Sequence, residues 1–305
     1  MVTASSDGTI RFWDFAEGSQ IEVIYAKRPV LSIALSADER SVAGGLTDGV
    51  VKLWKMTNSP SLVCEEEIIL ARDSRGDVLS VAFSLNDTKL AAGGNNQQHT
   101  RIWNLQKLDE RCKSSAIVGP VDAMGWVASG EILYANVPTS GIHRWRVNTE
   151  RSLTRTSNNG RRILLPNATG QPLFLFAHTI FFDHVNQPLY SYQGHVSMSP
   201  VSAQLIESRK WLVTADVIVN KIQPGEREPD EFVTVWDLTS GQPLAIMRDR
   251  FGQVGNIAVS PDGRHVVYGG GERETNRYQE VEITGDFDLR VWDISNTPNR
   301  AGIAQ

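Results

Sequence analysis

The chain has 305 residues, of which 41% are apolar, so it can bury a substantial hydrophobic core. Its 30 Lys and Arg against 35 Asp and Glu give a formal charge of −5, with no basic stripe. This balance argues against a nucleic-acid-binding protein. The two cysteines, Cys64 and Cys112, are too few for a disulfide framework, which favours a reducing compartment.

The sequence also argues against membrane insertion and secretion. The first residues, Met1 to Gly8, contain neither a basic segment nor an apolar core, so they are not expected to act as a signal peptide. The most apolar stretch, Leu164 to Phe182, is interrupted by Pro166 and Pro172 and is unsuited to span a bilayer. We therefore expect a cytoplasmic protein with no membrane partner.

An aromatic residue recurs at the end of an alternating apolar segment. Six of the eight tryptophans share this context, and a phenylalanine replaces the tryptophan once: Trp13, Trp54, Trp103, Trp145, Phe182, Trp236 and Trp292. Successive copies are 37 to 56 residues apart. A repeat of about 40–45 residues is typical of four short strands that form one unit.

The other strands of each unit are also visible. An apolar segment such as Leu31–Leu35, Leu79–Phe83 or Ile257–Val259 precedes a polar turn. The clearest turn is Ser260–Gly263, which contains Pro-Asp-Gly. A second segment then ends in small residues, as in Val42–Gly45. Short strands at regular spacing predict an all-β fold.

These copies resemble the WD40-repeat family, whose units carry a Trp-Asp pair on the third strand. Four copies keep the acid, at Asp14, Asp183, Asp237 and Asp293, and the family's Gly-His dipeptide is present only as Gly194-His195. The resemblance implies one domain over residues 1–305, a seven-bladed β-propeller. Its fifth unit, roughly Gly160 to Tyr192, departs furthest from the pattern.

The predicted ring is incomplete at its closure seam. Residues Met1–Ala4 match a second strand with no innermost strand before it, and only Ser295–Gln305 follow the last Trp-Asp. We expect the sequence to be a fragment of a longer chain. The alternative is that another protomer or a neighbouring domain completes the seam.

We interpret the recurrent aromatic residues as structural, packed between neighbouring blades, rather than as a stacking platform for bases or sugars. The family resemblance further implies that His195, Thr214 and Trp236 form one buried polar network. His178 and His184 lack a third ligand and a recognisable metal spacing, so no metal is predicted. No cofactor is predicted, and the cysteines are expected to be inert thiols.

Two insertions lie between the second and third strands of their units, Val217–Glu231 and Glu272–Asp286. These insertions, together with turns that lead into other units, such as those at Arg28 and Arg250, are predicted to bind a protein or peptide partner. The candidate contact residues are charged or aromatic: Arg28, Arg227, Asp230, Arg250, Phe251, Arg273, Arg277 and Tyr278. The alternative is that both insertions are solvated and bind nothing.

The sequence contains no Gly-x-Ser-x-Gly, phosphate-binding loop or His-Glu-x-x-His motif, and we assign no catalytic residue. The predicted function is a non-enzymatic scaffold or adaptor that binds a protein partner through loops on one face. The main alternative is a hydrolase-type propeller enzyme with its site at the central channel mouth. A purely structural role in a large assembly is a third hypothesis.

Overall fold

Most of the chain is described by a computed structural model. The described residues are 1–58, 62–72, 76–95, 99–108, 113–118, 120–127, 130–147, 151–155, 163–165, 173–176, 179–182, 188–192, 198–218, 231–249, 253–275, 281–284 and 289–296. They divide into two units, 1–164 with 169–172, and 165–168 with 173–305. Each unit is described by itself.

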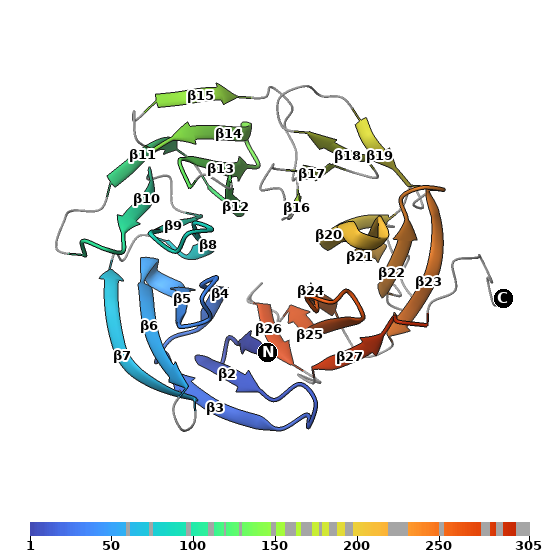
Figure 1. Ribbon diagram of the computed structural model, residues 1–305, viewed down its shortest axis with the longest axis horizontal. Helices are drawn as coiled ribbons and strands as arrows, with labels where there is room; N and C mark the ends of the chain where they lie inside the picture. Colours follow the sequence, from blue (N-terminus) through green and yellow to red (C-terminus); the bar gives the residue numbers. More distant parts are fainter. Residues whose placement is uncertain are drawn as a thin grey trace. The chain divides into compact units, whose positions relative to one another are not determined.

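The first unit contains fifteen complete strands (Figure 1). They are β1 (Val2–Ala4), β2 (Thr9–Trp13), β3 (Gln20–Tyr25), β4 (Val30–Leu35), β5 (Ser41–Leu46), β6 (Val51–Asn58), β7 (Leu62–Ala71), β8 (Val78–Phe83), β9 (Lys89–Gly94), β10 (His99–Asn104), β11 (Lys113–Val118), β12 (Ala123–Trp126), β13 (Ile132–Val137), β14 (Gly141–Arg146) and β15 (Arg151–Arg155). β16 (Ile163–Leu165) crosses the division between the units.

The second unit contains the later strands. They are β17 (Leu173–Phe176), β18 (Thr179–Phe182), β19 (Pro188–Ser191), β20 (Met198–Ile206), β21 (Trp211–Ile218), β22 (Glu231–Asp237), β23 (Gln242–Asp249), β24 (Gln253–Val259), β25 (His265–Thr275), β26 (Val281–Thr284) and β27 (Arg290–Asp293). Within the described residues, helix is confined to two 3₁₀ turns, η1 (Thr47–Gly49) and η2 (Glu207–Arg209). Neither is long and apolar enough to cross a membrane.

The described strands form antiparallel sheets, which confirms the predicted all-β class. Four-stranded sheets run in chain order as β4–β7, β8–β11, β12–β15, β16–β19 and β20–β23. The sheet at the start of the chain has three strands, β1–β3. In the last sheet, β24 pairs with β25, and β25 pairs with both β26 and β27. On the third strand of their four-stranded sheets lie Trp54, Trp103, Trp145, Phe182 and Trp236, whereas Trp13 lies on β2 and Trp292 on β27, which pairs with β25.

Small residues on the second strands allow adjacent sheets of the first unit to approach closely. A Cβ atom on Gly93 would lie 2.9 Å from Met124 Cε and 3.0 Å from Val121 Cβ, in the next sheet. Gly45 is similarly confined by Val78 of the sheet that follows it. The innermost strands β4, β8 and β12 consequently lie side by side (Figure 1).

The third-strand tryptophans fill the space between a sheet and the sheet that precedes it. Trp54 is fully buried and shares a cluster with Ile10 and Phe12 of β2. Trp103 packs with residues of β5 and β6, and Trp145 with residues of β9 and β10. Trp13, in the first sheet of this unit, remains partly exposed. The tryptophan is therefore the residue that joins one sheet to the previous one.

The same rule applies in the second unit. Trp292 of β27 packs against a cluster that contains Trp211, Val213 and Val235 of sheet β20–β23. Trp236 of that sheet is 5% exposed, and its ring centroid lies 4.6 Å from that of Tyr192, which follows β19.

The insertion between Tyr268 and Trp292 differs from the predicted loop. β25 continues to Thr275, and its last four residues pair with β26, from Glu272↔Thr284 to Thr275↔Val281. β27 then pairs with the first part of β25. The insertion extends the sheet as a β-hairpin, because alternating residues in Val281–Thr284 suit a strand.

In the second sheet, a charged residue of the outermost strand, Glu67 of β7, accepts the hydrogen bond of the tryptophan. A Cβ atom on Gly44 would lie 2.7 Å from the Trp54 ring, so no side chain fits there. Trp54 Nε1 instead donates to Glu67 Oε2 at 3.0 Å. Lys52 Nζ donates to Glu67 Oε1 at 2.8 Å and to the Ala26 carbonyl at 3.0 Å. Burial acts to raise the pKa of Glu67, but the bonds from Lys52 and Trp54 outweigh it and lower the pKa.

We predict that Glu67→Gln destabilises the chain by about 1–3 kcal/mol, because the Lys52 ammonium, 7% exposed, loses its counter-charge. Urea denaturation followed by tryptophan fluorescence measures this loss. The matched control is Glu66→Gln, which removes the half-exposed pair with Lys55 and should change stability by less than about 0.5 kcal/mol. Equal effects of the two substitutions would contradict the assignment.

Candidate functional site

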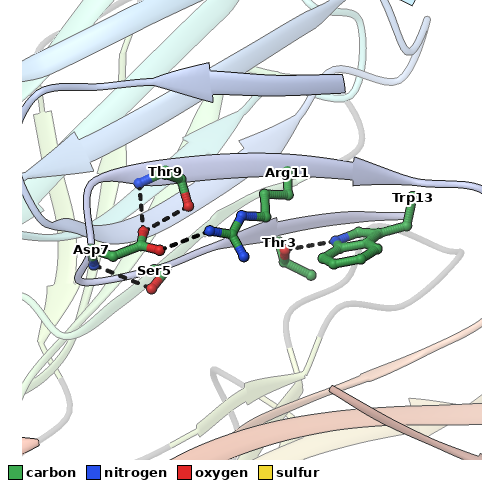
Figure 2. Close-up of polar contacts among 6 residues, drawn as sticks. All are labelled: Thr3, Ser5, Asp7, Thr9, Arg11 and Trp13. Carbon is green, nitrogen blue, oxygen red and sulfur yellow. Dashed lines mark hydrogen bonds and ion pairs between the residues drawn. The ribbon is translucent and has the colours of Figure 1, made fainter. Parts of the chain in front are cut away.

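The polar contacts that orient the tryptophans differ from sheet to sheet. In the first sheet, Trp13 Nε1 donates to Thr3 Oγ1 at 2.9 Å (Figure 2). The adjoining turn contains Asp7, whose Oδ1 accepts from the Thr9 amide and hydroxyl at 2.8 and 2.6 Å. Its other oxygen accepts from Arg11 at 3.1 Å. Burial acts to raise the pKa of Asp7, but the bonds from Thr9 and the charge of Arg11 bring it below its ordinary value.

In the sixth sheet, β20–β23, two of the three residues predicted to form a network are in contact. Trp236 Nε1 donates to Thr214 Oγ1 at 2.8 Å, and both residues are buried. His195 lies outside the described residues. The sequence prediction missed Asp216, which accepts a hydrogen bond from the Thr214 hydroxyl. Two residues after Thr214 in the alternation of β21, Asp216 lies on the same face of the strand.

Asp216 is 2% exposed. Burial raises the pKa of this carboxyl to about 6, against the smaller opposing effect of the bond from Thr214. Burial also raises the pKa of Tyr192, and the charge of Asp216 adds to that rise. No described residue forms an ion pair with Asp216, so its charged form is costly in this position.

A row of polar residues crosses one end of the second and third sheets. Arg28 lies in the turn before β4 and forms an exposed ion pair with Asp48 in η1. The Asp48 amide donates to Asp77 Oδ1 at 3.2 Å, and the Asp77 amide donates to Asn95 Oδ1 at 2.6 Å. We call Lys27, Arg28, Asp48, Asp77 and Asn95 the Arg28 row.

The backbone fixes the positions of these side chains. Lys27 and Asp48 have positive φ angles of 66° and 57°, so both turns are tight left-handed conformations. The Thr47 amide donates to the Pro29 carbonyl at 3.2 Å, which ties the two turns together. The charged side chains of the Arg28 row are therefore attached to a backbone of defined conformation.

The opposite end of the sheets is built differently. There the Asp87 carboxylate accepts from the amides of Ala37 and Asp38 at 2.9 and 3.0 Å, which joins the turns of two sheets. Lys89 Nζ donates to the Gly130 carbonyl of the next sheet at 3.1 Å. In the second unit, a Cβ atom on Gly263 would lie 2.7 Å from Ile206 of the preceding sheet.

The two ends also differ in the length of their connections. At the opposite end, the connections between the first and second strands have four or five residues in 36–40, 84–88, 127–131, 207–210 and 260–264 and seven in 166–172, and the connection 105–112 has eight. At the end of the Arg28 row, the connection between the second and third strands has three or four residues in 47–50, 95–98 and 138–140, and the equivalent connection 219–230 has twelve. The hairpin of β25 and β26 lies at the corresponding end of the last sheet.

Of the predicted contact residues, Arg28 is the one whose side chain is described, and its partner Asp48 was not predicted. The sequence signal for Asp48 is the Asp-Gly pair at 48–49, which favours a tight turn. Arg273 lies opposite Ile283 in the hairpin. The other predicted residues lie outside the described part of the chain: Arg227, Asp230, Arg250, Phe251, Arg277 and Tyr278. The binding role of all eight stays a prediction.

The structure gives no candidate metal centre within the described residues, where no three His, Cys, Asp or Glu side chains are grouped suitably. His178, His184 and Cys112 lie outside these residues. Cys64 is a half-buried free thiol on β7, and burial raises its pKa.

The comparisons with known proteins identify the repeat. A model of the WD40 family, described as WD domain, G-beta repeat, matches residues 1–14 and 18–55. Residues 1–55 of the chain therefore carry WD40 repeat sequence. The matched residues cover the first sheet, β4, β5 and the first part of β6, and include Trp13 of β2 and Trp54 of β6. This confirms the family resemblance inferred from the sequence.

A similar curated protein is telomerase protein component 1 of Rattus norvegicus, 29% identical to this chain over 160 residues. The alignment covers 48% of the chain and 6% of that protein. WD40 repeats generally mediate interactions between proteins, and proteins of the family are typically scaffolds without enzymatic activity.

We predict that the stability of the native chain falls between about pH 4 and pH 7 relative to that of Asp216→Asn. A carboxyl whose pKa is raised by folding stabilises the protein while protonated, and this contribution is lost as the pH rises through the folded pKa of about 6. The difference should approach roughly 2–3 kcal/mol at neutral pH. Urea denaturation of both proteins at several pH values measures it. A difference that does not change with pH would contradict the buried acid.

Proposed function

We propose that this WD40-repeat chain is a non-enzymatic adaptor that binds a protein partner through the Arg28 row and the corresponding connections of the other sheets. In this proposal the sheets are the blades of a seven-bladed propeller. The four-stranded antiparallel sheets and the packing of each third-strand tryptophan on the preceding sheet support that architecture. We also propose that the chain acts in the cytoplasm.

The observation that carries the proposal is the contrast between the two ends of the sheets. At one end of the first unit, the connections 36–40, 84–88 and 127–131 have five residues each and are tied to one another by Asp87 and Lys89. At the other end, connections lengthen to 219–230 and to the β25–β26 hairpin. Varied connections on a rigid framework are where protein recognition is usually found.

The charge of the Arg28 row suits a polar recognition surface. Arg28 and Asp48 are 47% and 60% exposed, so their ion pair contributes little to stability. Its residues are consequently available to contact a partner at little cost to the fold. Arginine at such a position can form paired hydrogen bonds with a carboxylate or a backbone carbonyl of a partner.

The similarity to a telomerase protein component extends the proposal. We propose that the partner is a subunit of a multiprotein assembly, in which this chain positions other components. The shared region is a small part of the relative, so this step concerns the type of partner and not a specific complex.

One contact bears on the hydrolase alternative. Ser140 Oγ lies 2.6 Å from His143 Nε2, as in a nucleophile and its base. In the first sheet, Arg11, which corresponds to His143 when both are counted back from the tryptophan, forms an ion pair with the turn residue Asp7. We therefore interpret Ser140 and His143 as the same turn-to-strand contact in another sheet. Labelling of Ser140 by a fluorophosphonate probe would reverse this interpretation.

We predict that Arg28→Ala, combined with shortening of 219–230 to a tight turn, removes a partner from affinity capture in the source cell's lysate. Quantitative mass spectrometry of captures with the native and altered chains measures the loss. The matched control is Arg40→Ala, which removes an exposed cation from the opposite end of sheet β4–β7.

The control and the native chain should capture the same partner in equal amounts. A partner lost equally from the control and the altered chain, or lost from neither, would contradict recognition at the Arg28 row. The altered chain should unfold at the same urea concentration as the native chain to within the effect of surface substitutions.

A further inference from the structure

The turn that carries Asp48 has a backbone conformation that needs support. Asp48 has a φ of 57° and a ψ of 34°, a region that few residues other than glycine adopt. Such a conformation persists only where the surrounding structure holds it. The hydrogen bond across the turn, from the Val50 amide to the Thr47 carbonyl, is long at 3.4 Å. Contacts with other parts of the chain are therefore expected to stabilise this turn.

One such contact comes from Asp77 of the third sheet. Asp77 directly precedes β8, and its Oδ1 accepts from the Asp48 amide at 3.2 Å. Its Oδ2 accepts from Asn95 Nδ2 at 3.3 Å, and the Asp77 amide donates to Asn95 Oδ1 at 2.6 Å. One oxygen of the carboxylate thus binds the second sheet and the other binds the third. The carboxylate of Asp77 joins these two sheets at the end of the Arg28 row.

The backbone of Asp77 is itself held in place within the third sheet. The Asn95 amide donates to the Asp77 carbonyl at 3.1 Å. A Cβ atom on Gly94 would overlap that carbonyl oxygen, so the two segments approach each other as closely as a glycine permits. The Gly94 carbonyl in turn accepts from the Val121 amide of the fourth sheet at 2.9 Å. The Asp77 carboxylate therefore reaches the Asp48 turn from a fixed position.

The corresponding Asp-Gly turn of the first sheet is held within its own sheet. Asp7 of that turn is bonded to three residues of the same turn and strand: Ser5, Thr9 and Arg11. The positive φ there, 81°, falls on Gly8, whereas in the second sheet it falls on Asp48 as well as on Gly49. A Cβ atom makes this conformation less favourable at Asp48 than at a glycine. The Asp48 turn consequently depends more on its neighbour.

We propose that Asp77 is a positioning residue for recognition at the Arg28 row. This inference rests on the proposed function, and it assigns Asp77 no contact with the partner. By accepting from the Asp48 amide, Asp77 fixes the place where the Asp48 carboxylate meets Arg28. Arg28 is thereby held in one orientation before a partner binds. A side chain ordered in advance loses less conformational entropy on binding, so the affinity for the partner is higher.

The opposite end of the same two sheets provides a matched control. There the carboxylate of Asp87, also from the third sheet, accepts from the amides of Ala37 and Asp38 of the second sheet. Both aspartates join the same sheets by the same chemistry, but only Asp77 lies at the end of the Arg28 row. Asp87 has a φ of 52°, so glycine can replace it without backbone strain. An effect specific to Asp77 would therefore not arise from a general weakening of the contact between the sheets.

Hydrogen exchange of the 305-residue chain, followed by mass spectrometry, tests the positioning without a partner. In Asp77→Ala, residues 46–51 should exchange about tenfold faster, because the turn loses a hydrogen bond to a charged acceptor. Asp77→Asn keeps an acceptor oxygen and should restore most of the protection, whereas Asp87→Gly should leave exchange of this segment unchanged. Circular dichroism and urea denaturation check that each variant is folded. Unchanged exchange in folded Asp77→Ala, or equally fast exchange in Asp87→Gly, would overturn the proposal.

Affinity capture with the same variants separates this inference from the proposed function. A partner that is lost when Arg28 is replaced and 219–230 is shortened should also be reduced in captures by Asp77→Ala. Asp77→Asn and Asp87→Gly should capture it as the native chain does. If Asp77→Ala retains this partner in full, the positioning role is wrong and the proposed function stands. If the chain altered at Arg28 and 219–230 retains every partner, both are contradicted.

Discussion

The structure depends on the packing of a tryptophan from one sheet against the sheet before it. Trp54, Trp103 and Trp145 do this in the first unit, and Trp292 does it in the second. A flat indole fills the space between two twisted sheets only if the second strands carry small residues, such as Gly45 and Gly93, where the sheets approach. The repeated packing therefore involves two adjacent sheets at a time, and each sheet is stabilised by its neighbours.

The hydrogen bond of the indole N–H varies although the packing does not. Thr3 and Thr214 accept it in two sheets, and Glu67 accepts it in a third. The acceptor depends on the residue of the second strand that lies against the indole ring. For Trp54 this residue is Gly44, which has no side chain to accept the hydrogen bond. In that sheet the outermost strand supplies the acceptor and Lys52 compensates its charge.

Much of this could be predicted from the sequence. The spacing of the tryptophans, the apolar alternation and the Ser-Pro-Asp-Gly turn each depend on local chemistry, and the corresponding strands and turn are present. The roles of Glu67 and Asp216 could not be predicted in this way. Each depends on a partner in another strand, and neither residue belongs to the repeated pattern. The hairpin of β25 and β26 was missed because a charged segment was interpreted as a loop.

The functional interpretation follows from the same framework. In the first unit, turns tied together at one end of the sheets leave the connections at the other end free to differ in length and charge. The Arg28 row is one such surface. Its ion pair between Arg28 and Asp48 could not be predicted from the sequence, because the two strands β4 and β5 separate these residues along the chain.

The packing of the tryptophans is tested most directly by the stabilities of Trp54→Ala and Trp13→Ala in urea denaturation. Trp54 is fully buried between two sheets, and its loss should cost about 3–5 kcal/mol. Trp13 is partly exposed, so its loss should cost distinctly less. A loss below about 0.5 kcal/mol for Trp54→Ala, or equal losses for the two variants, would contradict this account.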